Sequence, residues 1–599
     1  MQGPTLPISQ QVHEEKYRGP KESFREAMGR VASTLGDDER HFQTFRTILL
    51  DQRFLPAGRV QSAIGSTRNV TPYNCYVSGT IEDSFVEGHG SIMGRATEAA
   101  ATMRQGGGIG YDFSSLRPRG ASIKKLQSNS SGPVSFMEIY DSVCRCVASS
   151  GHRRGAQMGV LRVDHPDIEE FIRVKQPDDD VQRLWDAVAS IKDNSERIQA
   201  ASALQKTLKL TGFNVSVAVT DEFMECLQTG KGFDLRWGGQ VYKTIDPGAL
   251  WNIIMRGTWD WAEPGVLFID TINRMNNLYY CEKIAATNPC GEQPLPPYGA
   301  CLLGSFNLVK YVGSTNRDGQ SSRFIDISQL LEDVRPVVRA MDNVVDRARY
   351  PLYEQEKEAK NKRRMGLGVT GLANALEACG YPYGSASFLE AQESILSQLK
   401  NECYQASIEL AKEKGAFPVY ISSMYNKGEF IRTLDEGVQS ELRRHGIRNS
   451  HLTSIAPTGT ISLTADNVSS SIEPVFAYIM ERILRSATGD QTVEVQDYGY
   501  RVFGVQGKRA EDVTIDEHLG VLLAASRQVD SAVSKTCNVP GTVKWEDFKK
   551  LYVRAYEGGA KGCTTFRMDG KRTGILKARD SGEEELSCTV NADGSRSCE

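Results

Sequence analysis

The sequence predicts a large α/β protein, and three observations support this fold class. Beyond Pro133, helical patterns alternate with short β-branched runs such as "FNVSVAVT" and "LTSIAPTG", which is typical of α/β domains. The 599-residue chain is long enough to bury a sizeable core. Its apolar fraction of 40%, charged fraction of 24% and net charge of −4 are ordinary for a globular protein. We therefore expect one large α/β domain with smaller attachments.

The elements follow in order from the N-terminus. Residues 1–53 are predicted to form a helical region, because charged and apolar residues alternate at helical spacing in "ESFREAMGRVASTL" and "HFQTFRTILL". From Phe54 to Arg119 the chain is rich in glycine, threonine and short apolar runs, which favour strands and ligand-binding loops. The main α/β domain is expected over 54–576, and the acidic, polar segment 577–599 is predicted to be a flexible tail.

A helical hairpin is predicted inside the main domain, over residues 178–210. One helical face of its first half is apolar, and a second periodic stretch follows. The residues on that face are Val181, Leu184, Trp185, Val188 and Ile191.

The composition excludes several classes of protein. No apolar run reaches the roughly 18 residues of a membrane helix, and the first residues lack the apolar core of a secretory signal, so we expect a cytoplasmic protein. A net charge of −4 gives no general attraction to nucleic acid or membrane.

The thirteen scattered cysteines do not suggest a secreted disulfide framework. "CRC" at Cys144 and Cys146 lacks a second ligand pair, so no metal site is expected. The glycine runs lack the context of a dinucleotide-binding motif.

The polar loop "NPCGE" carries a candidate active site. Asn288, Cys290 and Glu292 alternate, and in an extended segment such side chains point the same way. Together they offer a hydrogen-bonding amide, a nucleophilic or hydrogen-abstracting sulfur and a proton-accepting carboxylate. A second thiol, Cys301, follows eleven residues after Cys290. Taken alone, these residues fit a buried cysteine beside a turn equally well.

The segment "PTGTIS" is a candidate phosphate-binding loop. It follows an apolar run and offers small hydroxyl side chains and backbone N–H groups at the start of a helix. An ordinary N-capping turn fits the same residues.

Nine motifs stand in order between about residue 54 and residue 567. They are "FLPAGR", "NCYVSGTIEDS", "GGGIGYDFSSLRPRG", "RRGAQMGVLRVDHPDIEEFI", "FNVSVAVTDEFM", "NPCGEQPLPPYGACLLGSFNL", "RRMGLGVTGLANAL", "SIAPTGTIS" and "KGCTTFR". The set resembles the catalytic subunit of ribonucleotide reductases, and most closely the adenosylcobalamin-dependent class II enzymes that reduce diphosphates.

The resemblance implies a ten-stranded α/β barrel with a central finger loop that carries the radical cysteine. By this resemblance, Cys290 is the thiyl radical site that removes the 3′ hydrogen of the ribose. Glu292 takes the proton of the 3′ hydroxyl, and Asn288 orients the sugar. Cys75 and Cys301 correspond to the redox pair that supplies two electrons and ends as a disulfide.

The resemblance also implies two nucleotide sites. The substrate diphosphate is expected at Pro457, Thr458, Gly459, Thr460 and Ser462, with Asn74 beside it. A deoxynucleotide or ATP effector is expected at Asp83, Ser84, Lys124 and Arg153, close to the interface of a homodimer. An exposed lysine pair on a solvated face is the alternative for Lys124.

Adenosylcobalamin is the cofactor that the resemblance implies, although no histidine motif marks the residues that contact it. "KGCTTFRMDGKR" lacks the paired tyrosines of class I large subunits, and the class III glycyl-radical signature is missing. A class I subunit with a separate radical-generating partner remains the alternative. Residues 1–53 are too short for a complete ATP-cone domain, so we expect no inhibition by dATP through one.

Cys588 and Cys598 in the tail match a dithiol that reduces the buried disulfide by exchange and is itself reduced by thioredoxin or a similar donor. An accidental pair of thiols is the alternative.

Residues 178–210 stand where many relatives have almost no chain, which suggests an insertion. Two other functions stay open: a regulatory nucleotide-binding protein built on a decayed reductase, and a redox or scaffold protein that uses only the tail thiols.

Overall fold

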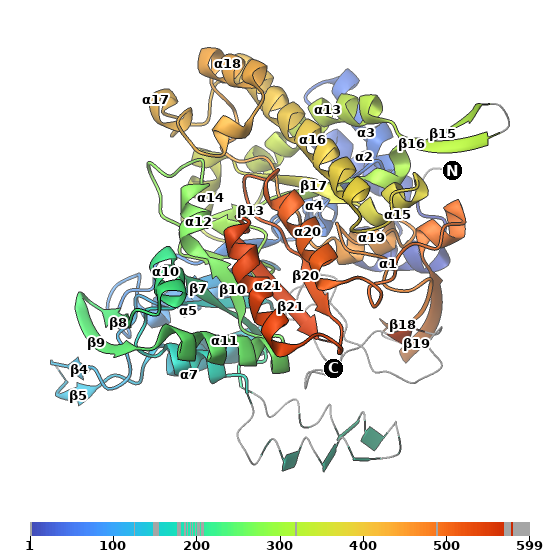
Figure 1. The fold of residues 1–599 in the computed structure, drawn as a ribbon. Helices are drawn as coiled ribbons and strands as arrows, with labels where there is room; N and C mark the ends of the chain where they lie inside the picture. Colours follow the sequence, from blue (N-terminus) through green and yellow to red (C-terminus); the bar gives the residue numbers. More distant parts are fainter. Residues whose placement is uncertain are drawn as a thin grey trace.

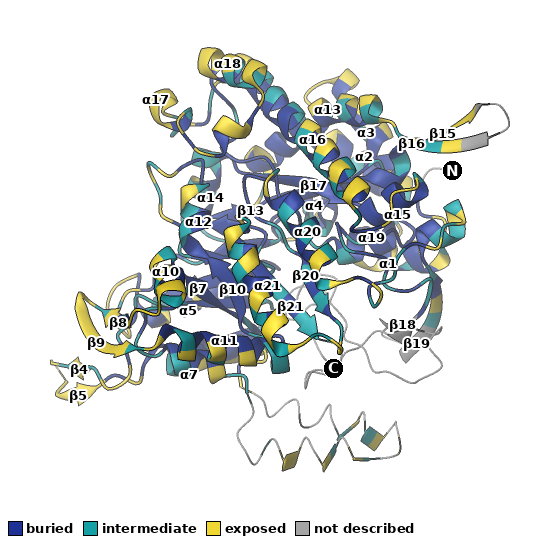
Figure 2. Cartoon of the chain, viewed as in Figure 1, coloured by how far each residue is buried: buried dark blue, intermediate teal, exposed yellow. Residues whose placement is uncertain are grey.

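The chain is a mixed α/β protein, as the sequence predicts (Figure 1). The computed structural model describes residues 3–124, 126–147, 155–176, 209–317, 320–486, 489–567 and 577–578, with isolated positions between 181 and 204. The strands of its largest sheet are mostly buried, whereas strand β9 and helix α18 are largely exposed (Figure 2). Among the described residues, no helix combines the length and the apolar character that crossing a membrane requires.

The largest sheet has eight strands in the order β13, β2, β3, β6, β7, β10, β21, β20. Their bounds are Ala300–Cys301, Cys75–Val77, Gly108–Asp112, Gln157–Arg162, Phe213–Val219, Gly265–Phe268, Gly562–Arg567 and Thr536–Val539. Strands β2 to β10 of this order run parallel, while β13 and β21 are antiparallel to their neighbours β2 and β10. Parallel neighbours need crossover connections, and the helices α5 (Ile92–Arg104), α6 (Pro133–Cys146) and α11 (Pro247–Trp261) provide three of them.

A second sheet has the order β1 (Phe54–Pro56), β14 (Leu303–Asn307), β17 (Gly366–Thr370). Only Leu302 separates β13 of the first sheet from β14 of the second. On its far side, Leu367 in β17 bridges to Thr453, and Ile455 bridges to Val533 shortly before β20. The two sheets are therefore linked at both edges.

Two-stranded hairpins and further helices complete the fold. The hairpins are β4–β5 (Ser122–Ile123, Ser128–Asn129), β8–β9 (Phe233–Trp237, Gln240–Ile245), β11–β12 (Ala286–Thr287, Pro294–Leu295) and β15–β16 (Val312–Arg317, Gln320–Ile325). Strands β18 (Ile479–Ser486), β19 (Gly489–Gln496) and β22 (Lys577–Ala578) form a small sheet. The helices are α4 (Gly58–Ala63), α7 (Ile168–Arg173), α10 (Asp221–Thr229), α12 (Ile269–Arg274), α13 (Ile327–Arg347), α14 (Tyr353–Lys362), α15 (Leu372–Ala378), α16 (Ala386–Lys414), α17 (Ser422–Tyr425), α18 (Glu436–His445), α19 (Gly459–Thr464), α20 (Ile515–Ser526) and α21 (Trp545–Glu557).

Three helices, α1 (Pro7–Tyr17), α2 (Phe24–Leu35) and α3 (Glu39–Leu50), lie in the N-terminal stretch. Helix α2 begins at a capping box, in which Ser23 accepts from the Glu26 backbone N–H and the Glu26 carboxylate accepts from the Ser23 N–H. The buried faces of α2 and α3 pack with α13 and α16 in one large apolar cluster. A second cluster joins β3, β6, β7 and β10 to α5, α6, α11 and α21. The candidate site adjoins the first cluster, which includes Cys75 and Cys301.

Candidate active site

The segment with Cys290 is a hairpin loop between β11 and β12, which pair in antiparallel register. The Gly291 N–H donates to the Asn288 carbonyl at 3.0 Å, and Gly291 has a φ of +80°. This turn reverses the chain, so the extended arrangement expected for "NPCGE" is wrong. Only glycine enters this left-handed region without steric cost, which explains the residue between Cys290 and Glu292.

Three segments that are distant in the sequence form hydrogen bonds to the backbone of this loop. The Asn214 side-chain amide, from β7, donates to the Pro289 carbonyl at 3.1 Å. On the other side, the Ser454 hydroxyl and the Ala532 N–H both donate to the Glu292 carbonyl at 2.9 Å. These bonds fix the loop backbone, so its side chains have defined positions.

Two glycines allow the strands to approach the hairpin closely. A Cβ atom on Gly110 of β3 would lie 1.8 Å from the Thr287 carbonyl oxygen, and one on Gly366 of β17 would lie 2.4 Å from the Gln293 Nε2 atom. Real contacts are never this short, so a side chain at either glycine would displace the hairpin. Gly110 of "GGGIG" and Gly366 of "RRMGLGV" are therefore packing positions for the loop.

Glu292 and Asn288 form the polar centre of the loop, and both are buried. Burial raises the pKa of Glu292 to about 7, although the neighbouring Asn288 amide opposes this shift. The Asn288 carbonyl oxygen Oδ1 accepts from the Gln293 N–H at 2.9 Å. Within the described residues, Asn288 Nδ2 and Glu292 Oε2 are buried without a hydrogen-bond partner. The Asn288 amide and the Glu292 carboxyl thus lie close to each other in the buried centre of the loop.

Cys75 and Cys301 lie directly opposite each other, because β2 and β13 pair in antiparallel register at these residues. Residues opposed in this way have Cα atoms about 4.5–5.5 Å apart, within the range that a disulfide spans. Both side chains are buried, and both are thiols in this structure. Tertiary structure therefore brings together two cysteines that are far apart in the sequence.

Cys290 completes a cluster of three thiols. Burial raises the pKa of Cys301 well above its usual range, and the neighbouring Glu292, Cys75 and Cys290 raise it further. Cys290 itself is only half-buried, unlike Cys75 and Cys301. One residue of the cluster is thus partly exposed, while the opposed pair is buried.

The "PTGTIS" segment lies at the start of helix α19, where Thr458 has a left-handed φ of +56°. The Thr458 hydroxyl does not cap the helix but contacts the Thr370 hydroxyl at 2.9 Å and accepts from the Ser471 N–H at 2.7 Å. The N-capping interpretation is therefore wrong for this side chain. Thr460 is buried, and its Oγ1 has no partner within the described residues.

Two further predicted substrate residues are Ser462, which ends this loop, and Asn74, which precedes Cys75 of the thiol pair. The Ser462 hydroxyl donates to the Gly459 carbonyl at 3.0 Å and contacts Ser470. The Asn74 N–H donates to the Cys301 carbonyl at 3.3 Å, and its buried Oδ1 has no partner in the described part of the chain. Asn74 thus joins the thiol pair from the adjacent position on the chain.

The predicted effector residues lie apart from the thiol cluster. Asp83 forms an ion pair with Arg117 at 2.7 Å, and Ser84 accepts from the Glu87 N–H at 3.1 Å. Lys124 is exposed, next to the β4–β5 hairpin. Arg117 was not singled out in the sequence, although it stands in "SSLRPRG", and its contact with Asp83 adds it to this group. Arg153 lies outside the described residues, as do Cys588, Cys598 and most of the 178–210 segment.

A second residue that sequence reasoning missed is Arg59, the last residue of "FLPAGR". A Cβ atom on Gly106 would lie 2.3 Å from its guanidinium, so that glycine makes room for Arg59. Burial lowers the pKa of Arg59, and the neighbouring Cys75 opposes the shift. A cation therefore stands beside one thiol of the opposed pair.

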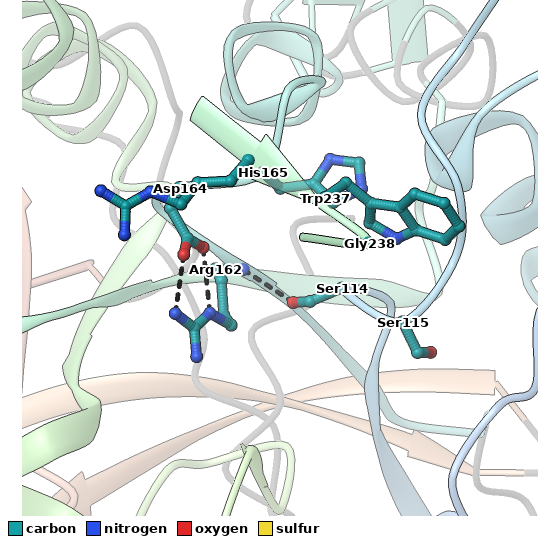
Figure 3. A pocket seen from close by; sticks show the side chains of 8 residues that line it. Ser114, Ser115, Arg162, Asp164, His165, Trp237 and Gly238 are labelled. Carbon is teal, nitrogen blue, oxygen red and sulfur yellow. Dashed lines mark hydrogen bonds and ion pairs between the residues drawn. The ribbon is translucent and has the colours of Figure 1, made fainter. Parts of the chain in front are cut away.

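A separate cavity of about 340 Å³ lies at the other end of the parallel strands (Figure 3). Its lining includes Ser114, Arg162, Asp164, Arg236 and Trp237. Arg162 pairs with Asp164 at 2.7 Å, and Arg236 pairs with Glu222 at 2.6 Å. Arg162 ends β6, whereas the loop contact Asn214 stands at the beginning of the neighbouring β7. The cavity is therefore not part of the thiol site.

The family of this chain is shown by a match to a family model. The model described as "Ribonucleotide reductase, barrel domain" matches residues 73–503, which include the thiol pair, the hairpin loop and the "PTGTIS" segment. The chain belongs to the ribonucleotide reductase family. In the part of the chain that is described, no cluster of three or more histidine, cysteine or acidic side chains is arranged to hold a metal ion.

Similar proteins carry more specific names. A "Vitamin B12-dependent ribonucleoside-diphosphate reductase" of Mycobacterium tuberculosis (strain CDC 1551 / Oshkosh) is 32% identical over 95% of this chain and 79% of its own length. A protein of the same name from Thermoplasma acidophilum is 34% identical over 79% of this chain and 59% of its own length. A "Vitamin B12-dependent ribonucleotide reductase" of Streptomyces clavuligerus is 27% identical over 90% of this chain and 61% of its own length.

Proposed function

We propose that this chain reduces ribonucleoside diphosphates to 2′-deoxyribonucleoside diphosphates by thiyl-radical chemistry that adenosylcobalamin starts. The observation that carries the proposal is the opposed pair Cys75 and Cys301 beside a loop with Cys290 and Glu292. The names of the similar proteins favour this class over a class I subunit that needs a separate radical-generating partner.

In the first half of the reaction, a thiyl radical on Cys290 takes the 3′ hydrogen atom of the ribose. Glu292 accepts the proton of the 3′ hydroxyl, for which a carboxyl with a pKa of about 7 is well suited at neutral pH. The Asn288 side-chain amide donates a hydrogen bond to the sugar. Asn288 Nδ2 and Glu292 Oε2 form no regular hydrogen bonds among the described residues, which supports these roles because a bound ribose could hydrogen-bond to both atoms.

In the second half, the opposed pair supplies two electrons and two protons. The 2′ hydroxyl leaves as water, a hydrogen from the pair replaces it at the 2′ carbon, and Cys75 and Cys301 end as a disulfide. Glu292 returns its proton to the 3′ oxygen, and Cys290 returns the hydrogen atom to the 3′ carbon and recovers its radical. Burial of Cys75, Cys301 and Glu292 supports this scheme, because a site that excludes water limits side reactions of the reactive intermediates.

Cys290 is the residue of the site that suits contact with the proposed cofactor. When bound, adenosylcobalamin supplies a one-electron oxidant by homolysis of its cobalt–carbon bond. Cys290 is the half-buried member of the thiol cluster, whereas Cys301 is fully buried, so Cys290 is the better placed of the two for a group bound outside the loop. Cys290 is the residue that we assign to the cofactor side of the site.

The substrate diphosphate is assigned to Pro457, Thr458, Gly459, Thr460 and Ser462, with Asn74 beside them. The unpartnered Oγ1 of Thr460 and Oδ1 of Asn74 support this assignment. The loop follows residues 453–455, and Ser454 in that stretch bonds the backbone of Glu292. Ribose at Glu292 and phosphate at the loop are then adjacent.

We also propose that the linked sheets close into one ten-stranded barrel around the hairpin loop. The ten strands are 300–307, β17, 453–455, 533–539, β21, β10, β7, β6, β3 and β2. Hydrogen bonds support the two joins outside the regular sheets: Ser454 N–H donates to Leu367 O at 3.0 Å, and Ser534 N–H donates to Ile455 O at 2.9 Å. The domain limits 1–53, 54–576 and 577–599 remain part of the same proposal.

Three partners complete the proposal. A deoxynucleotide or ATP effector binds at Asp83 and Ser84, with Arg117 and Lys124 as cationic phosphate contacts. Arg153 contacts either the phosphate or the base of this effector. Thioredoxin or a similar dithiol donor reduces Cys588 and Cys598, which in turn reduce the Cys75–Cys301 disulfide by exchange. A second copy of the chain covers an apolar surface beside the effector residues.

That surface gives a prediction about the oligomer. Phe85, Val86 and Met93 are 52%, 64% and 37% exposed, next to Asp83 and Ser84. Burying such side chains in a dimer is favourable by about 25 cal/mol per Å², so Phe85→Ser combined with Val86→Ser should shift the protein toward monomer. Sedimentation velocity measures the shift. Ile421→Ser, at a position 50% exposed elsewhere, is the matched control; equal shifts in both variants would contradict this interface.

An anaerobic assay of deoxynucleotide formation tests the activity. Ribonucleoside diphosphates and triphosphates are compared with and without adenosylcobalamin, with dithiothreitol as reductant and each deoxynucleotide effector in turn. We expect diphosphate turnover only with the cofactor. Turnover that needs an added radical-generating subunit instead would assign the chain to class I.

A further inference from the structure

Asn307, the last residue of β14, is fully buried, and neither polar atom of its side chain has a hydrogen-bond partner among the described residues. Its backbone N–H is satisfied, because it donates to the Arg53 carbonyl at 2.9 Å. A buried amide without partners is costly, and such groups in folded proteins are usually completed by water or a ligand. The position of Asn307 decides which occupant to expect.

The Asn307 side chain faces the same interior as the hairpin loop. In the parallel pair of β14 and β17, Leu303 is opposite Gly366 and Asn307 is opposite Thr370. Alternate residues of a strand share a face, so these two register pairs project to one side of the sheet. That side is the interior, because a Cβ atom on Gly366 would meet Gln293 of the hairpin loop.

Thr370 connects Asn307 to the proposed phosphate loop. The Thr370 hydroxyl contacts the Thr458 hydroxyl at 2.9 Å, and both hydroxyls accept from the Ser471 N–H. Ser471 Oγ and Thr460 Oγ1 are also buried without partners within the described residues. Asn307, Ser471 and Thr460 thus carry four side-chain polar atoms without partners among the described residues, and each of these residues is linked to the Thr370–Thr458 contact by register, by a backbone hydrogen bond or by the chain.

The distance along β17 relates the expected ribose position to Thr370. Ser454, which bonds the Glu292 backbone, lies against Gly368, since a Cβ atom there would be 2.2 Å from the Ser454 carbonyl. Thr370 is two residues further, or about 7 Å along a strand. A 5′-diphosphate whose ribose lies at Glu292 therefore ends near Thr370 and its register partner Asn307.

We propose that Asn307 is a substrate-binding residue whose side-chain amide donates a hydrogen bond to the terminal phosphate of the ribonucleoside diphosphate. It acts from β14, across from the 457–462 loop. The inference rests on the proposed function, since it assumes that the interior holds such a substrate. Asn307 then stands at the end of the phosphate chain, where it helps to select a diphosphate.

The test uses the full chain without adenosylcobalamin, so that binding is measured apart from turnover. CDP binding by equilibrium dialysis and the unfolding temperature of the ligand-free protein are compared for wild type, Asn307→Leu, Asn307→Asp and Thr460→Val. The matched control is Asn401→Leu, because Asn401 is buried with its amide bonded to the Ser397 carbonyl and the Asp435 N–H.

We expect Asn307→Leu to unfold at the same temperature as wild type or higher, because an apolar side chain removes an unsatisfied buried amide. Its CDP dissociation constant should rise at least about tenfold, or 1.4 kcal/mol. Asn307→Asp should bind still more weakly, since a carboxylate repels phosphate, and this near-isosteric variant serves if the leucine variant does not fold. Asn401→Leu should unfold at a lower temperature with unchanged CDP binding.

Two results would overturn the inference while leaving the proposed function intact. In one, Asn307→Leu and Asn307→Asp bind CDP as tightly as wild type while Thr460→Val binds weakly. In the other, Asn307→Leu loses stability as Asn401→Leu does, which would mean that a buried water completes the amide. If wild type itself does not bind CDP with any effector, the proposed function fails, and the role of Asn307 fails with it.

Discussion

Cys290→Ser is expected to abolish deoxynucleotide formation with every reductant, to below the detection limit of the assay. A serine hydroxyl holds its hydrogen too strongly to form the oxygen analogue of a thiyl radical, so the 3′ hydrogen of the ribose cannot be removed. The measurement is anaerobic turnover with adenosylcobalamin and dithiothreitol.

The controls for this variant are other thiols of the chain. Cys281→Ser changes an exposed thiol nine residues before Cys290 and should retain wild-type turnover. Cys588→Ser should stay active with dithiothreitol, which bypasses the tail, and lose activity only with a thioredoxin-type donor. Deoxynucleotide formed by Cys290→Ser would show that the radical role is assigned to the wrong residue. Activity lost equally in Cys588→Ser would instead favour a protein that works through its tail thiols.

Glu292→Gln is expected to lower kcat by about 10² to 10⁴, the usual contribution of a general base. The glutamine keeps the shape of the side chain but cannot take the 3′ hydroxyl proton. Because burial raises the pKa of Glu292 to about 7, wild-type activity should rise with pH through about 7 as the base ionises. The residual activity of the variant should lack this rise. An unchanged pH profile in Glu292→Gln would assign the rise to another group.

The same pKa predicts how stability depends on pH. The folded-state pKa lies above the usual value of 4.5, so the stability associated with protonated Glu292 is fully present below pH 4.5 and is lost as pH rises to about 7. Ligand-free Glu292→Gln should therefore gain stability relative to wild type between these pH values, by up to about 3 kcal/mol. Denaturant unfolding at pH 4.5 and pH 8 measures this gain. A stability difference that does not change with pH would mean that Glu292 is not buried in the ligand-free protein.

Much of the site could be predicted from residue types and from hydrophobic periodicity in single segments. The α/β class follows from periodicity, and the residue types of "NPCGE" suggest proton transfer and sulfur chemistry without any structure. The conformation of this loop was not predictable in the same way. Alternation suggested an extended segment, but Gly291 at a φ of +80° makes a turn. A glycine permits both conformations, and only the packing of the hairpin against Gly110 and Gly366 selects one.

The opposed thiols show a different limit. Cys75 and Cys301 occupy separate motifs, and no spacing rule relates them, because their contact depends on the register between β2 and β13. A shift of one residue in that register would turn one of the two side chains to the other face of the sheet. The family resemblance names the pair, whereas the strand pairing supplies the physical reason for it.

By itself, the sequence determined the class of fold and the chemical groups: three thiols, a carboxyl, an amide and a hydroxyl-rich loop. These are local properties of side chains and periodicity. Only the tertiary structure decided which groups meet and how their environment changes them. Burial shifts the pKa of Glu292, and strand register joins Cys75 to Cys301. At the end of β14, the buried Asn307 side chain has no hydrogen-bond partner among the described residues. Burial and register arise from contacts between distant segments, so no single stretch of sequence contains them.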